Sequence, residues 1–216
     1  MILEVRAAEP FFKNGYLLGC ERTREGVVVD PGDEAGDLLR AVERHQLRVT
    51  HILLTHAHLD HVSGVARARQ ALGARVGLHK DDLFLYEAVV QQGLAFGFRV
   101  GPQPAPDFFY QIPGEPIAFG DYEIRVHHTP GHCPGGVCLQ AGLKGQDGRH
   151  LFVGDTLFAG SIGRTDLPGG DYDTLIRSIR DVLLAFPDDH EVYSGHGPAT
   201  TIGEERRSNP FLRIEN

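Results

Sequence analysis

One seven-residue segment, THAHLDH at residues 55–61, constrains this chain more than any other feature. Within six residues it places three imidazoles and one carboxylate, those of His56, His58, Asp60 and His61. Nitrogen and carboxylate donors of this kind are ligands that Zn²⁺ and Fe²⁺ accept in proteins. A loop whose histidines merely face solvent is the alternative, but it leaves their density unexplained. The segment therefore predicts a metal site, which requires a rigid framework behind it.

Three further donor residues each follow a predicted strand and lie beside a glycine: His132 in PGH, Asp155 in VGD and His196 in SGHG. Glycine lets the backbone turn sharply, so that a loop can direct one side chain to a shared point. Loops at one end of a sheet often carry binding and catalytic residues. Taken singly, His132 and His196 could equally be structural. Together, the three loops predict donors that converge on the 55–61 segment.

The hydrophobic pattern places strands and helices around these loops. The predicted strands cover residues 16–20, 26–29, 51–54, 75–78, 122–128, 137–141, 151–153 and 191–194. The predicted helices cover residues 35–45, 62–72 and 171–186, with mixed helical character at 80–96, a short helix-like stretch at 204–207 and an irregular proline-rich loop at 101–114.

Strands, a helix and a histidine-bearing loop recur in both halves of the chain. This recurrence predicts an α/β fold with two sheets flanked by helices, an αββα sandwich. Because no linker or low-complexity tract interrupts the chain, residues 1–216 are expected to form a single domain. The remaining histidines at helix ends and strand edges are interpreted as structural: His45, His51, His79, His127 and His128.

Charge and composition disfavour several classes of partner. The formal net charge is −8 and no segment is a block of lysines and arginines, which disfavours nucleic acid. No apolar run approaches the roughly 20 residues of a membrane-spanning helix. The three cysteines are too few for a disulfide framework, and the first residues do not resemble a leader peptide. The expectation is a cytoplasmic protein that acts on a small molecule.

The order HxHxDH, then His132, Asp155 and His196, resembles the metallo-β-lactamase superfamily across essentially the whole chain. The resemblance implies a first metal held by His56, His58 and His132, and a second held by Asp60, His61 and His196. Asp155 would bridge the two metals, and Asp30 in VDPG would support the site or the fold. Two divalent ions are expected, with Zn²⁺ favoured over Fe²⁺ or Mn²⁺, and no organic cofactor.

The donor set itself indicates hydrolysis. Two cations a few ångströms apart can share a water, lower its pKa toward neutrality and polarise the carbonyl under attack. No serine or cysteine nucleophile is then required. Asp60 is expected to be both a ligand of the second metal and the catalytic group that orients the water and receives its proton.

Two segments of the second half, GDTLFAGSIGRTDLPGGD and SGHGPATTIGEERRSNPFL, resemble the short single-domain relatives of glyoxalase II, the hydroxyacylglutathione hydrolases. This resemblance implies a thioesterase acting on S-lactoylglutathione or a related thioester. Long forms of glyoxalase II carry a helical C-terminal domain with basic residues for glutathione, and this sequence shows no counterpart. Arg164 is the candidate substrate anchor, with a structural salt bridge as its alternative.

Rival functions share parts of the pattern. Persulfide dioxygenases have a similar framework and a GRTD segment but use one Fe²⁺, here implied on His56, His132 and Asp155. The SGHGP and NGYLLG segments favour the hydrolase group.

A nuclease usually adds a basic arm, and true β-lactamases usually replace the residue at the position of His61. A metal-binding module without activity would leave the open donor geometry unexplained.

Overall fold

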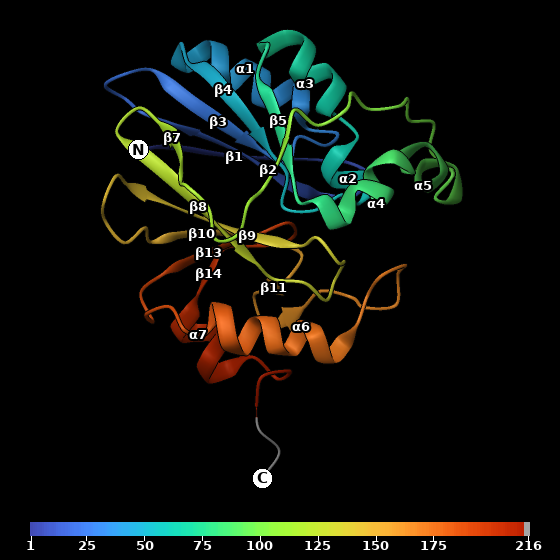
Figure 1. The fold of residues 1–216 in the computed structure, drawn as a ribbon, viewed down its shortest axis with the longest axis vertical. Coiled ribbons are helices and arrows are strands. Elements are labelled where there is room, and N and C mark those ends of the chain that lie inside the picture. The colour runs from blue at the N-terminus through green and yellow to red at the C-terminus, as the bar shows by residue number, and fades with distance from the viewer. Residues whose placement is uncertain (214–216) are drawn as a thin grey trace.

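Two sheets lie face to face in the computed structural model, which describes residues 1–213 (Figure 1). The first sheet contains, in spatial order, β1 (Ile2–Ala8), β2 (Lys13–Gly19), β3 (Glu25–Val29), β4 (Arg48–Leu53), β5 (Arg75–Leu78) and β6 (Phe108–Phe109). The second contains β14 (Thr200–Thr201), β13 (Glu191–Ser194), β10 (His150–Gly154), β9 (Val137–Leu143), β8 (Tyr122–His128) and β7 (Ile117–Phe119). A two-stranded ribbon pairs β11 (Leu157–Phe158) with β12 (Ser161–Ile162).

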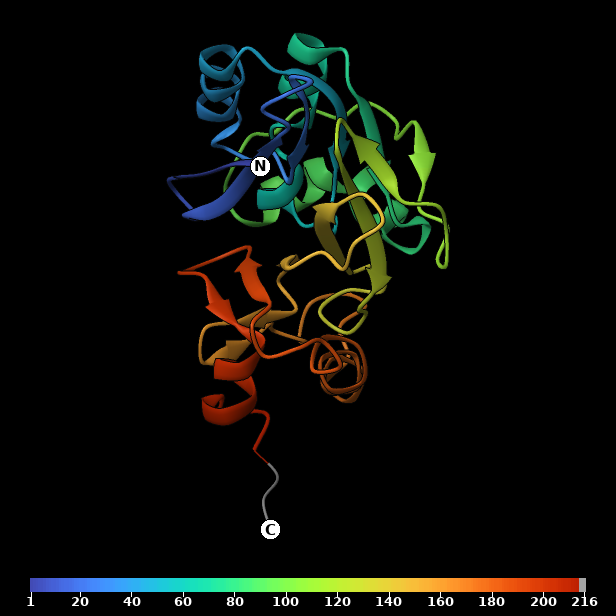
Figure 2. The same ribbon diagram turned by 90° about the vertical axis from the view of Figure 1, so that its left-hand side faces the viewer.

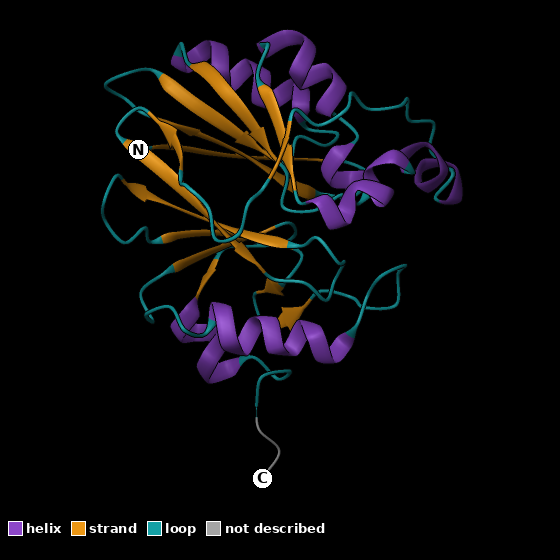
Figure 3. Cartoon of the chain, viewed as in Figure 1, coloured by secondary structure: helices purple, strands orange, loops and turns teal. Residues whose placement is uncertain are grey.

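Helices cover the outer face of each sheet, which gives the predicted αββα layers (Figure 3). The helices α1 (Ala35–His45) and α3 (Val65–Leu72) lie on the first sheet, while α6 (Tyr172–Ser178) and α7 (Ile202–Ser208) lie on the second. Seen from the side, these helix pairs form opposite ends of the molecule with the sheets between them (Figure 2). No helix among residues 1–213 has the length and apolar character that crossing a bilayer requires.

Three buried apolar clusters hold these layers together. The first includes Val65 of α3 and Ile52 of β4, and the second, between the sheets, includes Val29 and Phe152. The third lies under α6 and includes Leu175. Removal of such apolar surface from water is the dominant favourable term in folding. The sandwich is therefore stabilised on both faces of both sheets, and its strand ends form a rigid base for loops.

Several elements differ from the sequence prediction. Strand β1 was not predicted, because its charged residues interrupt the apolar pattern. In the structure it forms a strand by pairing antiparallel with β2. The predicted helix at 62–72 divides into α2 (Leu59–Val62) and α3, with a break at Gly64, where a side chain would meet the carbonyl oxygen of Gly32. The predicted helix at 171–186 is α6 followed by a π-helical turn at Ile179–Leu183.

The region predicted as mixed helix, 80–96, forms a short 3₁₀ turn at Lys80–Asp82 and the helices α4 (Leu83–Glu87) and α5 (Val89–Ala95). The proline-rich stretch 101–114 is irregular as predicted, except that β6 adds an edge strand to the first sheet. The helix-like stretch at 204–207 lies within α7, whose first turn is capped by the Thr201 hydroxyl accepting from the Glu204 amide.

Candidate metal centre

The first sheet delivers its donors at the carboxyl ends of two parallel strands. β3 and β4 pair Val29 with Leu53, so the chain leaves both strands side by side at Asp30 and at the 55–61 segment. The carboxyl edge of parallel strands is a common position for binding sites in α/β folds. The loop from β4 then enters α2, which carries Asp60 and His61 on its first turn.

The second sheet repeats this arrangement. β10 and β13 are parallel and pair Gly154 with Ser194, so Asp155 and His196 follow at the same edge. The loop between the antiparallel strands β8 and β9 supplies His132. Residues separated by more than a hundred positions therefore meet where the two sheets face each other.

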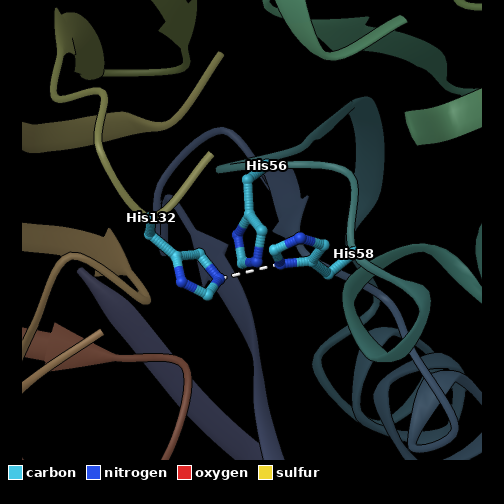
Figure 4. A group of neighbouring side chains, drawn as sticks. All are labelled: His56, His58 and His132. Atoms are coloured by element: carbon cyan, nitrogen blue, oxygen red, sulfur yellow. Dashed lines mark hydrogen bonds between the residues drawn. The ribbon is translucent and has the colours of Figure 1, made fainter. Parts of the chain in front are cut away.

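His56, His58 and His132 form a group that we call the first half-site (Figure 4). Their rings turn toward one another, and one nitrogen from each lies within 4.8 Å of the others. His58 Nδ1 is only 2.8 Å from His132 Nε2. All three side chains are buried. Three buried imidazoles facing one point are a donor set suited to a transition metal.

Asp60, His61 and His196 form a second such group, the second half-site, again with donor atoms within 4.8 Å. His196 Nε2 lies 3.0 Å from Asp60 Oδ2. Asp155 lies between the half-sites, because its Oδ1 is 3.3 Å from His61 Nε2 and its Oδ2 is 3.7 Å from His132 Nε2. The structure thus brings together all seven residues that the sequence suggested as donors.

Four donor atoms of this group lack a hydrogen-bond partner within residues 1–213 although they are buried: His56 Nε2, His58 Nε2, His61 Nε2 and Asp155 Oδ1. Buried polar atoms are nearly always paired, because an unpaired one costs roughly 1–3 kcal/mol. His56, His61 and Asp155 also offer donor atoms within 4.8 Å of one another, and unpaired nitrogen and carboxylate donors gathered in this way fit bound cations. The residues present are therefore compatible with the metals that the sequence implied.

The protonation of the histidines agrees with this fit. Burial and the neighbouring His61 hold the pKa of His56 well below its ordinary value, and burial with His132 lowers the pKa of His58 to about 3. Burial opposes the charge on His61, but Asp60 and Asp155 outweigh it and raise that pKa to about 10. The neutral imidazoles of His56 and His58 can bind a cation directly. His61 instead carries a proton, whose positive charge compensates the negative charges of Asp60 and Asp155 as a bound cation would.

Hydrogen bonds behind the donors fix the orientation of the rings. Asp30 Oδ2 lies 2.9 Å from His61 Nδ1, and Asp30 also accepts from the Thr55 amide and hydroxyl. His132 Nδ1 lies 2.7 Å from the carbonyl oxygen of Arg164. When the outer ring nitrogen donates a proton to such an oxygen, the other nitrogen presents its lone pair to the centre.

Gly195 shows how closely the chain approaches this centre. A Cβ atom at position 195 would lie 2.1 Å from Asp155 Oδ1 and 2.7 Å from His61 Cε1. No side chain could be accommodated without displacing both donors. The glycine beside His196 is therefore required by close backbone approach to the site.

A cavity of about 180 Å³ opens above the donors. Apart from the donors, its walls are mainly apolar and aromatic: Phe11, Leu59, Phe96 and Leu167, with Gln92 and Arg164. The Phe11 ring meets Phe96 edge-on with centroids 6.3 Å apart. A small apolar pocket with a few polar groups at its base is typical of a small-molecule site.

Arg164, the candidate substrate anchor, has two different contacts. Its backbone carbonyl holds His132, whereas its guanidinium forms a two-pronged ion pair with Asp166 at 2.7 and 2.6 Å. Both side chains are well exposed, and an exposed pair contributes little to stability. The guanidinium can therefore exchange Asp166 for an anionic group on a ligand at small cost.

Two supporting residues escaped the sequence prediction. Asp82 accepts from the backbone amides of Ala57 and Gly135, and Gln92 bonds to the Leu59 amide and the Ala57 carbonyl on either side of His58. Neither residue lies in a recognisable donor motif. Their only early signal was their position in the segment between β5 and the proline-rich loop.

Another cluster, His79, Asp81 and His128, lies outside the centre. The two rings stack with centroids 4.4 Å apart and planes 14° apart. An imidazole lone pair lies in the plane of its ring, so two stacked rings cannot direct their lone pairs at one ion. His128 Nε2 is also 2.9 Å from the Pro134 carbonyl. This geometry favours the structural interpretation of both histidines.

The model of the family described as the metallo-beta-lactamase superfamily matches residues 8–196. The chain belongs to the metallo-beta-lactamase superfamily. The αββα sandwich of this chain also resembles a solved structure of this superfamily. The crystal structure of BLEG-1 B3 metallo-beta-lactamase superposes with a TM-score of 0.88 at 36% identity, covering 98% of this chain and 99% of that one. The predicted family and fold are confirmed.

Two further relatives of this superfamily are similar over nearly their full length. The chain is 38% identical to the hydroxyacylglutathione hydrolase GloC of Haemophilus influenzae over 217 residues, covering 100% of both chains. The crystal structure of TTHA1623 in a di-iron-bound form has a TM-score of 0.85 and 40% identity, covering 97% of this chain and 100% of that one. The chain is thus a metallo-hydrolase of the metallo-beta-lactamase superfamily.

Proposed function

We propose that this chain is a two-metal thioesterase of glyoxalase II type that hydrolyses S-lactoylglutathione or a related thioester. The observation that carries the proposal is the pairing of two complete half-sites around Asp155, at the base of a small apolar pocket. The full-length similarity to a hydroxyacylglutathione hydrolase supports the choice of thioester. Zn²⁺ is the proposed ion, with Fe²⁺ or Mn²⁺ as alternatives.

A two-metal site is favoured over the single iron of a persulfide dioxygenase. A facial triad of His56, His132 and Asp155 would leave His58 outside the coordination sphere. His58 Nδ1 instead lies 2.8 Å from His132 Nε2, so it shares the first half-site fully. The second half-site is equally well assembled, and each of its members points a donor inward.

When bound, two divalent cations would lower the pKa of a water and polarise the substrate carbonyl. In this proposal His56, His58 and His132 would hold one ion and Asp60, His61 and His196 the other, with Asp155 between the two half-sites. Opposing its burial, the charges of His61 and His196 lower the pKa of Asp60. Asp60 therefore stays ionised at neutral pH and can accept a hydrogen bond that orients the attacking water.

The residues around the pocket suit a thiol leaving group. A thiol of pKa near 8.5 leaves as the thiolate, whereas an amine must be protonated before it leaves. The pocket walls supply arginine, glutamine and apolar side chains, and the described histidines and aspartates there belong to the donor group. This lining supports a thioester over the amide of a β-lactam.

The remaining proposals concern partners and compartment. The small pocket and the negative charge support a small-molecule substrate in preference to nucleic acid. Cys20, Cys133 and Cys138 are free and buried in the described structure, which fits a reducing compartment such as the cytoplasm.

A comparison of three reactions tests this function. Metal-free protein would be loaded separately with Zn²⁺, Fe²⁺ and Mn²⁺, and each form analysed for metal content. Thiol release from S-lactoylglutathione, O₂ uptake with glutathione persulfide and hydrolysis of a chromogenic cephalosporin would then be compared. Two bound ions with thiol release as the fastest reaction are expected. One iron with O₂ uptake would instead establish the dioxygenase, and cephalosporin turnover above thiol release would overturn the substrate class.

A further inference from the structure

Asp82 is a fully buried carboxylate that joins the two loops of the first half-site. Its Oδ2 accepts from the Ala57 amide at 3.0 Å and from the Cys133 thiol at 3.1 Å, and its Oδ1 accepts from the Gly135 amide at 2.6 Å. All three donors come from segments that carry histidines.

The positions of these donors matter for the metal centre. Ala57 lies between His56 and His58, and Cys133 directly follows His132. A single carboxylate therefore sets the separation of the two loops that must converge on one ion. The approach is close, because a Cβ atom at Gly135 would lie 2.7 Å from Asp82 Cγ.

The second half-site has a different carboxylate behind it. Asp30 accepts from the Thr55 amide at 2.7 Å and lies 2.9 Å from His61 Nδ1. Within residues 1–213, the side-chain hydrogen bonds of Asp82 reach the first half-site loops only, and those of Asp30 reach Thr55 and His61. Thr55 Oγ1 also lies 3.1 Å from His56 Nδ1, so Asp30 reaches the first half-site indirectly, whereas the described hydrogen bonds of Asp82 do not reach a side chain of the second half-site.

We propose that Asp82 is a positioning residue for the first half-site alone, whereas Asp30 supports His61 of the second half-site directly and the first half-site only through Thr55. This inference rests on the proposed metal-dependent function. It predicts that a change at Asp82, which touches neither ion, weakens the binding of the first ion and leaves that of the second unchanged.

Asp82→Asn is the most informative change because it preserves size and removes the charge. An asparagine has one acceptor oxygen and directs an NH₂ group at the remaining donors, so at least one of the three hydrogen bonds becomes a donor–donor contact. Loss of such outer support typically lowers metal affinity about 10–100-fold.

The experiment measures Zn²⁺ affinity by chelator competition in two backgrounds of the full chain. His196→Ala disables the second half-site, and His58→Ala disables the first. Adding Asp82→Asn is expected to weaken Zn²⁺ binding about 10–100-fold in the His196→Ala background and to leave it unchanged in the His58→Ala background. Equal weakening in both backgrounds, or none in either, would overturn the inference.

Asp107→Asn is the matched control. Asp107 also accepts from a backbone amide, that of Val76, and pairs with Arg69, but it contacts neither loop of the centre. It should leave Zn²⁺ affinity unchanged in both backgrounds. Thermal unfolding of the metal-free forms shows whether each variant folds.

Cys133→Ala provides a second route if Asp82→Asn does not fold, since it removes one of the three donors and keeps the carboxylate. It should weaken Zn²⁺ binding in the His196→Ala background only, and by less than Asp82→Asn. An unchanged affinity in that background would count against the inference. A wild-type chain that binds no Zn²⁺, Fe²⁺ or Mn²⁺ would contradict the proposed function itself, which distinguishes the two failures.

Discussion

Lys13 Nζ lies 2.6 Å from Glu34 Oε1, and both side chains are almost completely buried. Lys13 also donates to the carbonyl oxygen of Asp30, and Glu34 Oε1 accepts from the Gly32 amide at 2.9 Å. This ion pair therefore braces the turn in which Asp30 adopts a left-handed conformation, with φ at 48°. Because Asp30 orients His61, a buried pair outside the centre supports one of its donors.

Lys13→Met should destabilise the metal-free protein by about 3–5 kcal/mol, because it leaves the Glu34 carboxylate buried without a partner. The double variant Lys13→Met/Glu34→Leu should lose less, since no charge is stranded, although the Asp30 carbonyl and Gly32 amide still lose partners. Urea unfolding of the wild type, the single variants Lys13→Met and Glu34→Leu, and the double variant measures this coupling. Strictly additive losses would contradict the interpretation of the pair as one unit.

An exposed pair serves as the comparison. Arg22 and Asp121 form a salt bridge in which the arginine side chain is 74% exposed. Arg22→Met should change the free energy of unfolding far less than Lys13→Met does, because solvent screens an exposed pair. A loss as large as that of Lys13→Met would show that burial is not the cause.

His56→Ala should lower metal content and thioesterase activity together. His56 is the donor that appears in both the first half-site and the group with His61 and Asp155, so its loss affects both ions. Elemental analysis of the purified variant, alongside thiol release, checks this. His51→Ala is a suitable control, since His51 is a half-buried histidine of β4 that packs against Phe108. Retention of two ions by His56→Ala would remove this residue from the proposed ligand set.

Asp60→Asn should separate metal binding from turnover. The first half-site is intact in this variant, so one ion should remain bound, whereas turnover should fall at least about 100-fold with the loss of the water-orienting carboxylate. Asp33→Asn changes an exposed carboxylate that bonds only to Ser63 Oγ among the described contacts, and it should retain full activity. Metal analysis with single-turnover thiol release distinguishes the two effects. Full turnover by Asp60→Asn would exclude its proposed role.

Glu4 gives the fold a pH dependence that is separate from the metal centre. Hydrogen bonds from His45, Arg6 and Arg44 lower its pKa from 4.5 to about 2. A carboxylate with a lowered pKa contributes stability above its unfolded pKa and loses it as the pH falls toward the folded pKa. Glu4→Gln should therefore cost about 1 kcal/mol at pH 6, because the group is partly exposed.

The difference between Glu4→Gln and the wild type should shrink from about pH 4.5 downward and vanish near pH 2. Urea unfolding of the metal-free forms at several pH values measures it. A difference that stays constant between pH 6 and pH 2.5 would show that the ionised carboxylate is not responsible.

The donors could be predicted from the sequence because their chemistry is visible in residue type and local spacing. His56, His58, Asp60 and His61 fall within one short segment, and glycine marks the turns that carry the other three. Strand ends also follow from short apolar runs, so the convergence of the loops was predictable from pattern alone, although not that they come from two different sheets.

The supports of the site could not be predicted in the same way. Asp82 accepts from Ala57 and Cys133, which lie 25 and 51 residues away, and both contacts depend on how loops from two sheets meet. The start of α2 at Leu59 was also missed, because four donors in seven residues obscure the apolar period of a four-residue helix. Such features depend on tertiary contacts that local pattern does not encode.

Arg164→Ala tests whether the guanidinium anchors a substrate carboxylate. If it does, KM for S-lactoylglutathione should rise about tenfold with kcat nearly unchanged, since a uniform binding contact worth about 1.4 kcal/mol is lost. KM for the lactoyl thioester of an uncharged thiol should not change. Arg177→Ala, an exposed arginine of α6 bonded to Thr174, controls for loss of surface charge. Equal effects on both thioesters would assign Arg164 a structural role, through its ion pair with Asp166 and its backbone contact with His132.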